Sequence, residues 1–387
     1  MRPPLIVPVV LAMLIAAEGA EHAWAVQTLY SVKDLGDLLG GADYSEAYAL
    51  NESAQAVGRG NVPSEVHATL FSGGGTTTDL GVLQADHHFS IAWDINDSGV
   101  AVGMSSTYSN QAENLRPVMF ANGTVEYLGS FGGDYGAARG INAAGQAVGI
   151  SRYASGARHA FVWHQGTMTD IDDMGPGTYD FSDAYDINEN GQVVGDYSRV
   201  YGTDHAFLWE QGTGMTDLDT LPGMVHSMAY KINNVGQVVG ESSTVFTPGW
   251  YSLGRACLWE NGSVIDLGLL PGNAYSIAWS INDSGLAVGA AYTDPEHDDL
   301  DHRAFIWDSV DGIQDLNGML DSSGAGWTLL VAQDINSRGQ IVGWGVNPSG
   351  STHAFLLTPA IIPEPSTLWI WSLLAALGIF AGHRRRR

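Results

Sequence analysis

A nine-residue pattern, Ile-Asn-x-x-Gly-x-x-Val-Gly, recurs along the interior of the chain and constrains its fold more than any other feature. Successive copies of its asparagine are 45, 46, 46, 45, 49 and 54 residues apart. A period of this length indicates a repeat architecture, in which each unit buries its apolar face against the next one. The asparagines are Asn51, Asn96, Asn142, Asn188, Asn233, Asn282 and Asn336.

Two further segments follow each copy of the pattern. The first has the form His-Ala-Phe-Leu-Trp, as in 205–209, and the second the form Thr-Asp-Leu-Gly, as in 78–81. Each unit therefore contains four short β-prone stretches, which is the content of one propeller blade. The Asn-x-x-Gly step predicts a turn, because Asn can cap its own backbone and Gly supplies a positive φ. We predict an all-β fold over residues 26–360, a seven-bladed β-propeller of four-stranded blades.

The two ends of the repeat region complement each other. The seventh unit lacks a Thr-Asp-Leu-Gly stretch after His353, whereas residues 28–36 precede the first unit as an unpaired stretch of that kind. In a ring, the N-terminal strand would complete the last blade and protect an edge that otherwise invites aggregation. A linear solenoid would have no reason to divide a unit in this way.

The repeat resembles the HAF repeat of bacterial extracellular proteins over residues 28–358. The motifs that carry the resemblance are the Asn pattern and the His-Ala-Phe segment. That family has no established chemistry to transfer.

The first 25 residues read as a signal peptide. Arg2 supplies the positive start, residues 5–17 the apolar run, and Ala23-Trp24-Ala25 a small-x-small cleavage site. An uncleaved anchor is the alternative, but the apolar run is shorter than the roughly 20 residues that a bilayer span needs. The mature chain is expected to begin near Val26.

Residues 361–387 predict a C-terminal hydrophobic helix with a basic end. Its apolar run, 368–382, would be about 22 Å long against a hydrocarbon core of about 30 Å, so it is a weak permanent anchor. The arginines at 384–387 favour the cytoplasmic side, which places the repeats outside the cytoplasm.

Together with Pro363, Glu364 and Pro365, this tail resembles the PEP-CTERM sorting signal of Gram-negative bacteria. The resemblance implies an exosortase-type processing enzyme as partner, transient inner-membrane contact, and a final place at the cell surface or in an exopolysaccharide matrix. The alternative is an inner-membrane anchor that holds the protein facing the periplasm.

The charge balance excludes one class of partner. The chain has 42 Asp and Glu against 16 Lys and Arg, so it would repel nucleic acid. Hydrophobic residues make up 45% and glycines number 49, which is typical of a folded, turn-rich protein. The single cysteine, Cys257, cannot form an intramolecular disulfide and is expected to be a buried filler.

Three Asp-Ile-Asn-x-x-Gly runs, at Asp94, Asp186 and Asp334, resemble calcium loops. The EF-hand spacing from Asp186 would need an acid at position 12, where Tyr197 stands, so we expect a turn and no calcium. The first position of the run also varies, to Ala49, Gly140, Lys231 and Ser280.

A histidine that recurs in the repeat invites a metal or general-base interpretation. The position alternates between His and Arg, and Arg can replace neither a metal ligand nor a base, but it can replace a hydrogen-bond donor. We therefore predict structural donors that face the Asp of a Thr-Asp-Leu-Gly stretch or a backbone carbonyl. They are His67, Arg116, His159, His205, Arg255, Arg303 and His353.

Two clusters fall outside the repeat, Asp86-His87-His88 and an acidic loop at 294–302. Acidic loops are usually only solvated, so the loop is a weak candidate for a divalent cation, and no cofactor is expected. Its candidate ligands are Asp294, Glu296, His297, Asp298, Asp299 and Asp301.

No recognisable catalytic motif is present, which leaves a non-enzymatic role as the leading hypothesis. The expected function is a cell-surface or extracellular-matrix protein whose propeller loops bind a glycan or another matrix component. The alternatives are a purely structural matrix protein and an exported polysaccharide hydrolase or lyase with a site built from several loops. The aromatic residues of the His-Ala-Phe segments are expected to pack between blades.

Overall fold

The computed structural model describes residues 28–107, 114–172, 181–198, 203–244, 253–293 and 301–360. Residues Tyr30–Pro359 form one compact unit, which carries the repeats, and Met1–Leu29 with Ala360–Arg387 are assigned to a second. The expected signal peptide, the C-terminal helix and the sorting motif lie outside the described residues. Within the described ranges, no helix is long and apolar enough to cross a membrane.

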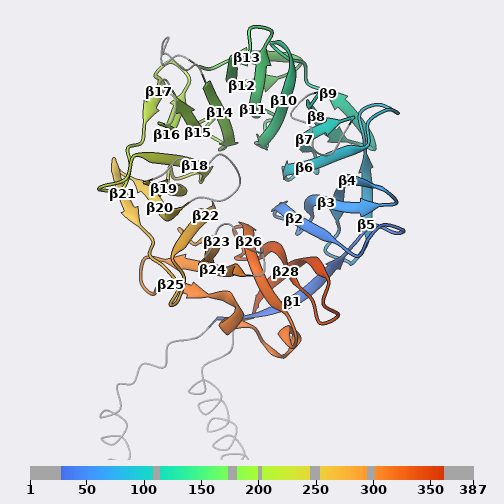
Figure 1. Ribbon diagram of the computed structural model, residues 1–387, viewed down its shortest axis with the longest axis vertical. Helices are drawn as coiled ribbons and strands as arrows, with labels where there is room; N and C mark the ends of the chain where they lie inside the picture. Colours follow the sequence, from blue (N-terminus) through green and yellow to red (C-terminus); the bar gives the residue numbers. More distant parts are fainter. Residues whose placement is uncertain are drawn as a thin grey trace, which may run out of the picture. The chain divides into compact units, whose positions relative to one another are not determined.

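The repeat unit is all-β and propeller-like, with four strands for each copy of the sequence pattern (Figure 1). The first strands, nearest the centre, are β2 (Ser45–Leu50), β6 (Phe89–Ile95), β10 (Gly132–Ile141), β14 (Phe181–Ile187), β18 (His226–Ile232), β22 (Tyr275–Ile281) and β26 (Thr328–Ile335). The second strands are β3 (Ala56–Val62), β7 (Ala101–Ser106), β11 (Ala147–Tyr153), β15 (Val193–Ser198), β19 (Val238–Ser243), β23 (Ala287–Tyr292) and β27 (Ile341–Val346).

The remaining strands lie farther from the centre. The third strands are β4 (Glu65–Phe71), β8 (Arg116–Ala121), β12 (Arg158–His164), β16 (His205–Glu210), β20 (Gly254–Glu260), β24 (Arg303–Asp308) and β28 (Thr352–Ala360). The fourth strands are β5 (Thr77–Gly81), β9 (Thr124–Tyr127), β13 (Thr167–Asp170), β17 (Gly214–Asp217), β21 (Ser263–Asp266), β25 (Gly312–Asp315) and β1 (Leu29–Gly36). Two short 3-10 helices, Leu316–Met319 and Ser322–Gly324, follow β25.

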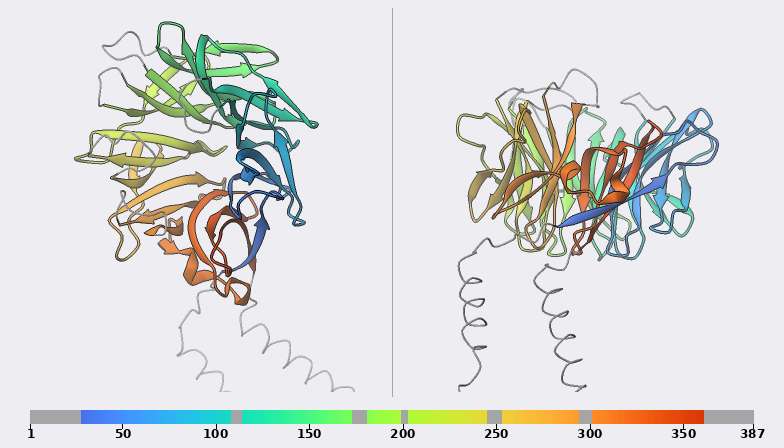
Figure 2. Two further views of the ribbon diagram at one scale, coloured as in Figure 1. Left: turned by 45° about the vertical axis from the view of Figure 1, so that its right-hand side comes forward. Right: turned by 90° about the horizontal axis from the view of Figure 1, so that it is seen from below.

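The strands of each unit form an antiparallel meander, as in β18-β19-β20-β21 and β22-β23-β24-β25. Two pairs of meanders join into eight-stranded sheets through single parallel bridges, Val66 to Phe89 and Arg158 to Phe181. The sheet with β26, β27 and β28 takes β1 as its fourth strand. Seen from the side, the sheets stand next to one another (Figure 2).

The Asn turn joins the first and second strands as the sequence predicts. At Asn188, the side-chain Oδ1 accepts hydrogen bonds from the backbone N–H groups of Asn190 and Gln192, each at 3.0 Å. Gly191 has a φ of +75°, a conformation that costs L-residues roughly 1–2 kcal/mol. The turn is thus a short-range device that any copy of the pattern can form.

The asparagines also connect the repeats to one another. The Nδ2 of each donates to the backbone carbonyl of the asparagine in the next repeat at 3.0–3.3 Å, and the series ends with Asn336 donating to Asn51. These amides are buried, so each bond satisfies a donor that would otherwise be costly to bury.

The second glycine of the pattern has a different role, which is to allow a close approach of two strands. A Cβ on Gly103 would lie 1.8 Å from the carbonyl oxygen of Ile91, and Gly149 and Gly240 would meet a carbonyl oxygen at 2.0 and 1.9 Å. Opposite each of these glycines the first strand has a β-bulge, as between Ala92 and Asp94. Any side chain at the glycine would collide with backbone, so the bulge requires glycine.

The hydrophobic core lies between neighbouring sheets. The Ala-Phe pair of the third strands is fully buried, for example at Ala160 and Phe161. Phe207 packs with Val148 and Ile171 of the preceding repeat. The aromatic residues of these segments are therefore packing residues, as predicted, and Cys257 is buried among them.

Candidate functional site

The bulge in each first strand sets one residue outside the regular strand pairing. The bulged residue lies between two register positions, as Trp93 does between Ala92 and Asp94. The seven bulged residues are Tyr48, Trp93, Arg139, Tyr185, Tyr230, Trp279 and Gln333. Because a bulge re-aims a side chain, the first six contact one another across repeats.

Six of them form a continuous series that we name the axial ring. Their order is Tyr48, Trp93, Arg139, Tyr185, Tyr230 and Trp279. Neighbouring ring centroids, or the Arg139 Cζ and a ring centroid, lie 4.7–5.3 Å apart. The Arg139 guanidinium is 5.2 Å from the ring centroids of both Trp93 and Tyr185, which is cation–π distance on each side. This series was not predicted from the sequence, although its residues stand three positions before each asparagine.

Buried acids lie next to one arc of the axial ring. Asp183 and Asp196 are cross-strand neighbours in β14 and β15, and Arg158 Nε is 3.0 Å from Asp183 Oδ1. Burial, together with the nearby Asp183, raises the pKa of Asp196 well above its ordinary value. On the next repeat, the Tyr230 hydroxyl donates to Glu241 Oε1 at 2.9 Å.

A buried charge cluster is formed by the residues that directly follow the bulged residues in three of the first strands, Lys231, Asp94 and Asp186. Lys231 Nζ is 3.3 Å from Asp186 Oδ1 and 3.8 Å from Asp94 Oδ1. Burial raises the pKa of Asp94 to about 6, although Lys231 counteracts the rise. Asp186 Oδ2 also accepts a hydrogen bond from the backbone of Ile232 in the next repeat, at 2.9 Å. The Asp-Ile-Asn runs are therefore turns with inter-repeat acceptors, in agreement with the prediction.

The recurrent His or Arg of the third strands contacts the Asp of the fourth, as the sequence predicts. His67 Nδ1 is 2.8 Å from Asp79, and His205 Nδ1 is 2.7 Å from Asp217. Arg255 bonds Asp266 in the same way. In the second repeat a tyrosine replaces the Asp, and there the Arg116 guanidinium lies 5.8 Å from the Tyr127 ring centroid, so a cation–π contact takes the place of the ion pair.

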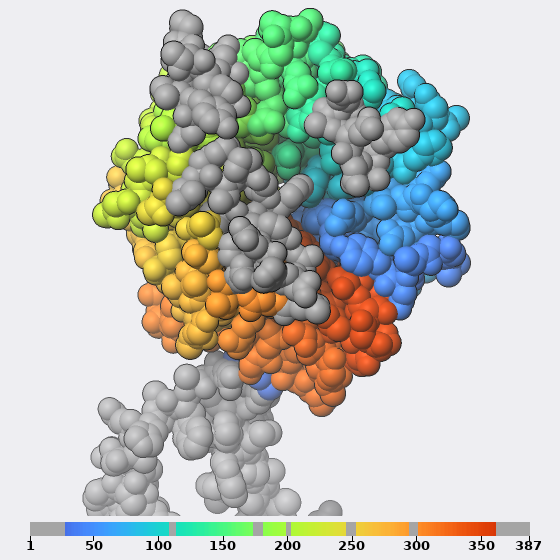
Figure 3. Space-filling view, viewed as in Figure 1, coloured from blue at the N-terminus to red at the C-terminus, as the bar shows by residue number. Residues whose placement is uncertain are grey.

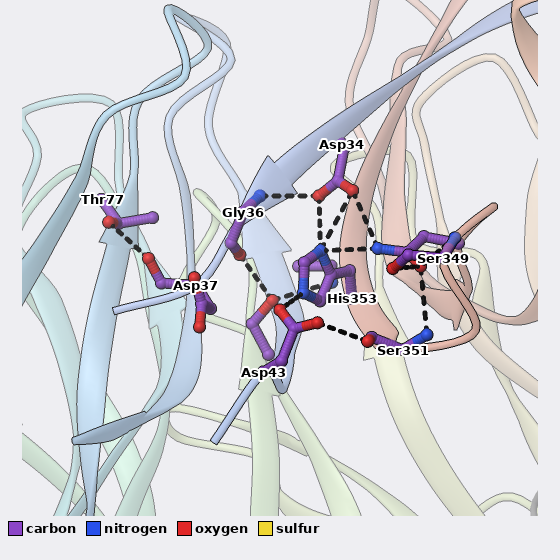
Figure 4. A network of polar contacts seen from close by, with 11 residues as sticks. Asp34, Gly36, Asp37, Asp43, Thr77, Ser349, Ser351 and His353 are labelled. Carbon is purple, nitrogen blue, oxygen red and sulfur yellow. Dashed lines mark hydrogen bonds and ion pairs between the residues drawn. The ribbon is translucent and has the colours of Figure 1, made fainter. Parts of the chain in front are cut away.

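In the last sheet this pair joins residues from opposite ends of the chain (Figure 4). His353 Nδ1 lies 2.9 Å from Asp34 of β1, and its Nε2 lies 2.7 Å from Asp43. Asn347 also donates to Asp34, and Ser351 to Asp43. The hydrogen bond to Asp34, followed by that to Asp43, raises the pKa of His353 to about 9, so the imidazole is charged at neutral pH.

We expect this junction to weaken in alkali. The folded-state pKa of about 9 exceeds the ordinary value of about 6.5, so the stabilisation is complete below about pH 6.5 and is lost as the pH rises through 9. At about 1.4 kcal/mol per pKa unit it amounts to at most roughly 3 kcal/mol. Thermal unfolding at pH 7 and pH 10 should show a larger loss for the wild type than for His353→Gln. Equal losses of stability in the two proteins would contradict the role of His353 at this junction. His205→Gln is the matched control, because its Asp partner lies in the same repeat and His353 is kept.

Of the six candidate metal ligands in the acidic loop, the structure describes only Asp301. Asp294, Glu296, His297, Asp298 and Asp299 lie outside the described residues. Asp301 is described, and its carboxylate accepts a hydrogen bond from the backbone of Thr293 at 2.9 Å. In the part of the chain that the structure describes, no group of three or more His, Cys, Asp or Glu side chains is placed to hold a metal ion.

The Asp86-His87-His88 cluster separates into two environments. His87 is buried, and its Nδ1 lies 2.8 Å from the Ser105 hydroxyl. His88 is half exposed and contacts Glu65 beside a surface cavity. The two adjacent histidines therefore do not act as one ligand pair.

Comparison with known proteins gives one family model that matches part of the chain and a set of distant structures. A family model for DUF3466, a protein family of unknown function, matches residues 133–253. No curated protein matches the chain.

Three solved structures illustrate the structural similarities. A prolyl endopeptidase has a TM-score of 0.47 at 10% identity, over 94% of this chain and 56% of its own, so this chain spans about half its length. A gluconolactonase from Xanthomonas campestris has a TM-score of 0.43 at 11% identity, over 88% and 93% of the two chains. TolB from Acinetobacter baumannii has a TM-score of 0.42 at 12% identity, over 86% and 80%. No activity transfers from similarity this low.

Proposed function

We propose that residues 28–360 form a seven-bladed β-propeller that closes through its N-terminal strand. The pairing of β1 with β28 and the return of the asparagine series from Asn336 to Asn51 support this closure. So does a core in which Leu35 and Leu50 pack with Leu356. In the space-filling view, the first and last parts of the repeat region are neighbours (Figure 3).

We further propose that the protein is exported and acts at the cell surface or in the extracellular matrix. The signal-like start, the basic C-terminal tail and the Pro363-Glu364-Pro365 motif support this location. An exosortase-type enzyme is the proposed processing partner of the tail.

The proposed activity is binding of a glycan or related matrix component at the axial ring. The supporting observation is the continuous series of aromatic side chains around Arg139. Aromatic faces present rigid apolar area to a sugar ring, while Arg139, Tyr185 and the nearby acids supply directional polar groups. Packing of the sheets does not require this composition, because the bulged position is Gln333 in the last repeat.

Co-sedimentation of the full chain in mild detergent with the organism's extracellular polysaccharide tests this proposal. We expect salt-resistant retention that falls at least about tenfold in Trp93→Ala and Tyr185→Ala, since a central aromatic contact contributes about 1.4 kcal/mol or more. Tyr127→Ala is the matched control, because Tyr127 is an exposed aromatic residue on an outer strand. Equal retention of all variants would show that the polysaccharide binds elsewhere than at the axial ring. No retention of the wild type would favour a purely structural role.

A further inference from the structure

A cavity of about 500 Å³ lies between the first two repeats, away from the axial ring. The β3–β4 hairpin and the entry to β6 form most of its wall, and the parallel bridge from Val66 to Phe89 holds these segments together. Its volume is within the range of small-molecule sites. It is lined by Ala42, Asn61, Val62, Ser64, Glu65, Val66, His88 and Thr107.

The titratable groups at this cavity form a chain. His88 Nδ1 is 2.7 Å from Glu65 Oε1, and His67 Nε2 is 3.0 Å from Glu65 Oε2. Behind them, His67 Nδ1 contacts Asp79 at 2.8 Å. Hydrogen bonds from His88 and then His67 lower the pKa of Glu65, so it is a carboxylate at neutral pH.

Comparing the repeats shows which of these titratable groups belong to the repeated fold and which are particular to this cavity. A His–Asp pair like that of His67 recurs elsewhere, so it is structural. Glu65 has one acidic counterpart, Asp301, since the residue two positions before the repeated His or Arg is Asn114, Ala157, Thr203, Leu253, Asp301 or Ser351 in the other repeats. His88 likewise corresponds to Val225 and Ala274 in later repeats. The fold does not require Glu65 and His88, which is why they point to a function.

The contact on Nδ1 decides what His88 can do. A carboxylate on Nδ1 favours the tautomer with the proton there and leaves a lone pair on Nε2, which is the arrangement of a general base. A single general base can take a proton from water as the water attacks an ester. Glycoside hydrolysis would need a second positioned carboxyl, and phosphoryl transfer would need cations, whereas no Lys or Arg is among the described residues that line the cavity.

We propose that this cavity is a hydrolytic site for a small acyl ester, such as an O-acetyl group on a hydroxyl-rich ligand. His88 Nε2 takes a proton from water as the water oxygen bonds to the acyl carbon. The tetrahedral intermediate then collapses, the ester C–O bond breaks, and the leaving alkoxide takes the proton from the imidazolium. Ester and water thus give acid and alcohol, with His88 restored. Glu65 is a positioning residue for His88.

Hydrolysis of p-nitrophenyl acetate by the full chain tests this proposal. We expect His88→Gln to lower kcat/KM by about 100-fold or more, the usual contribution of a general base. Glu65→Gln should lower kcat with little change in KM, and Glu65→Asp should restore part of the loss. His205→Gln, which removes a structural His–Asp pair elsewhere, should hydrolyse the ester like the wild type.

Folding of each variant is checked by thermal unfolding. A wild-type rate no higher than that of His88→Gln, with both proteins folded, would overturn the proposal. A loss in His205→Gln equal to that in His88→Gln would overturn it as well. The outcome is independent of glycan binding at the axial ring, which Trp93→Ala and Tyr185→Ala report separately.

Discussion

Replacing Gly103 with alanine is expected to cost at least about 4 kcal/mol of stability or to prevent folding. The added Cβ would lie 1.8 Å from the carbonyl oxygen of Ile91 and about 3 Å from the backbone of Ala92. Both are backbone atoms, so no side-chain rotation can relieve the collision, and the bulge at Trp93 would have to straighten. Urea unfolding followed by tryptophan fluorescence measures the effect.

The neighbouring glycine of the same pattern is the matched control. Gly99 has a φ of +80°, and a Cβ there would meet only the flexible end of Gln55 at 3.7 Å. Gly99→Ala should therefore cost only the roughly 1–2 kcal/mol of a left-handed conformation. If the two variants were equally stable, strand contact would not be the reason for Gly103.

Replacing Lys231 with methionine is expected to destabilise the protein by about 3–5 kcal/mol at pH 7.5. The change leaves Asp186 and Asp94 buried without their ammonium partner, and loss of one member of a buried ion pair costs about this much. A urea titration of the purified variant gives the loss directly.

The loss should shrink in acid. Burial already raises the pKa of Asp94 to about 6 beside Lys231, and removing the ammonium raises it further, so at pH 5 this carboxyl is neutral and needs no partner. A second variant that combines Lys231→Met with Asp186→Asn should regain at least half of the stability. A destabilisation that is the same at pH 5 and pH 7.5 would argue that Lys231 acts by packing alone.

The His–Asp pairs show how far a repeat can be interpreted before its structure is known. Because the repeated position is either His or Arg, a metal-ligand or general-base role was excluded and a hydrogen-bond donor was predicted. In the structure these side chains contact the predicted partners Asp79, Asp217 and Asp266. The prediction succeeded because donor and acceptor belong to adjacent strands of one unit. Their spacing along the chain is nearly constant from repeat to repeat.

The axial ring could not be predicted in the same way. Tyr48, Trp93, Arg139 and Tyr185 occupy equivalent positions, but they vary in chemistry and are separated by about 45 residues. A strand pattern alone assigns alternate residues to alternate faces, and only the bulge brings these side chains into contact across repeats. A search for variable aromatic residues beside the invariant Asn could have found them.

The all-β class, the four strands of each repeat, the Asn turn and the glycine positions could all be predicted from the sequence. These features depend on local backbone conformation and on contacts between strands of one unit. Both recur with the sequence pattern, so the pattern is enough to predict them. The structure was needed to show which side chains from different repeats meet, as Lys231 meets Asp94 and as Glu65 meets His88. Such contacts depend on the arrangement of whole sheets around a centre. The repeat spacing predicts the repeated sheets but does not say which of their side chains meet.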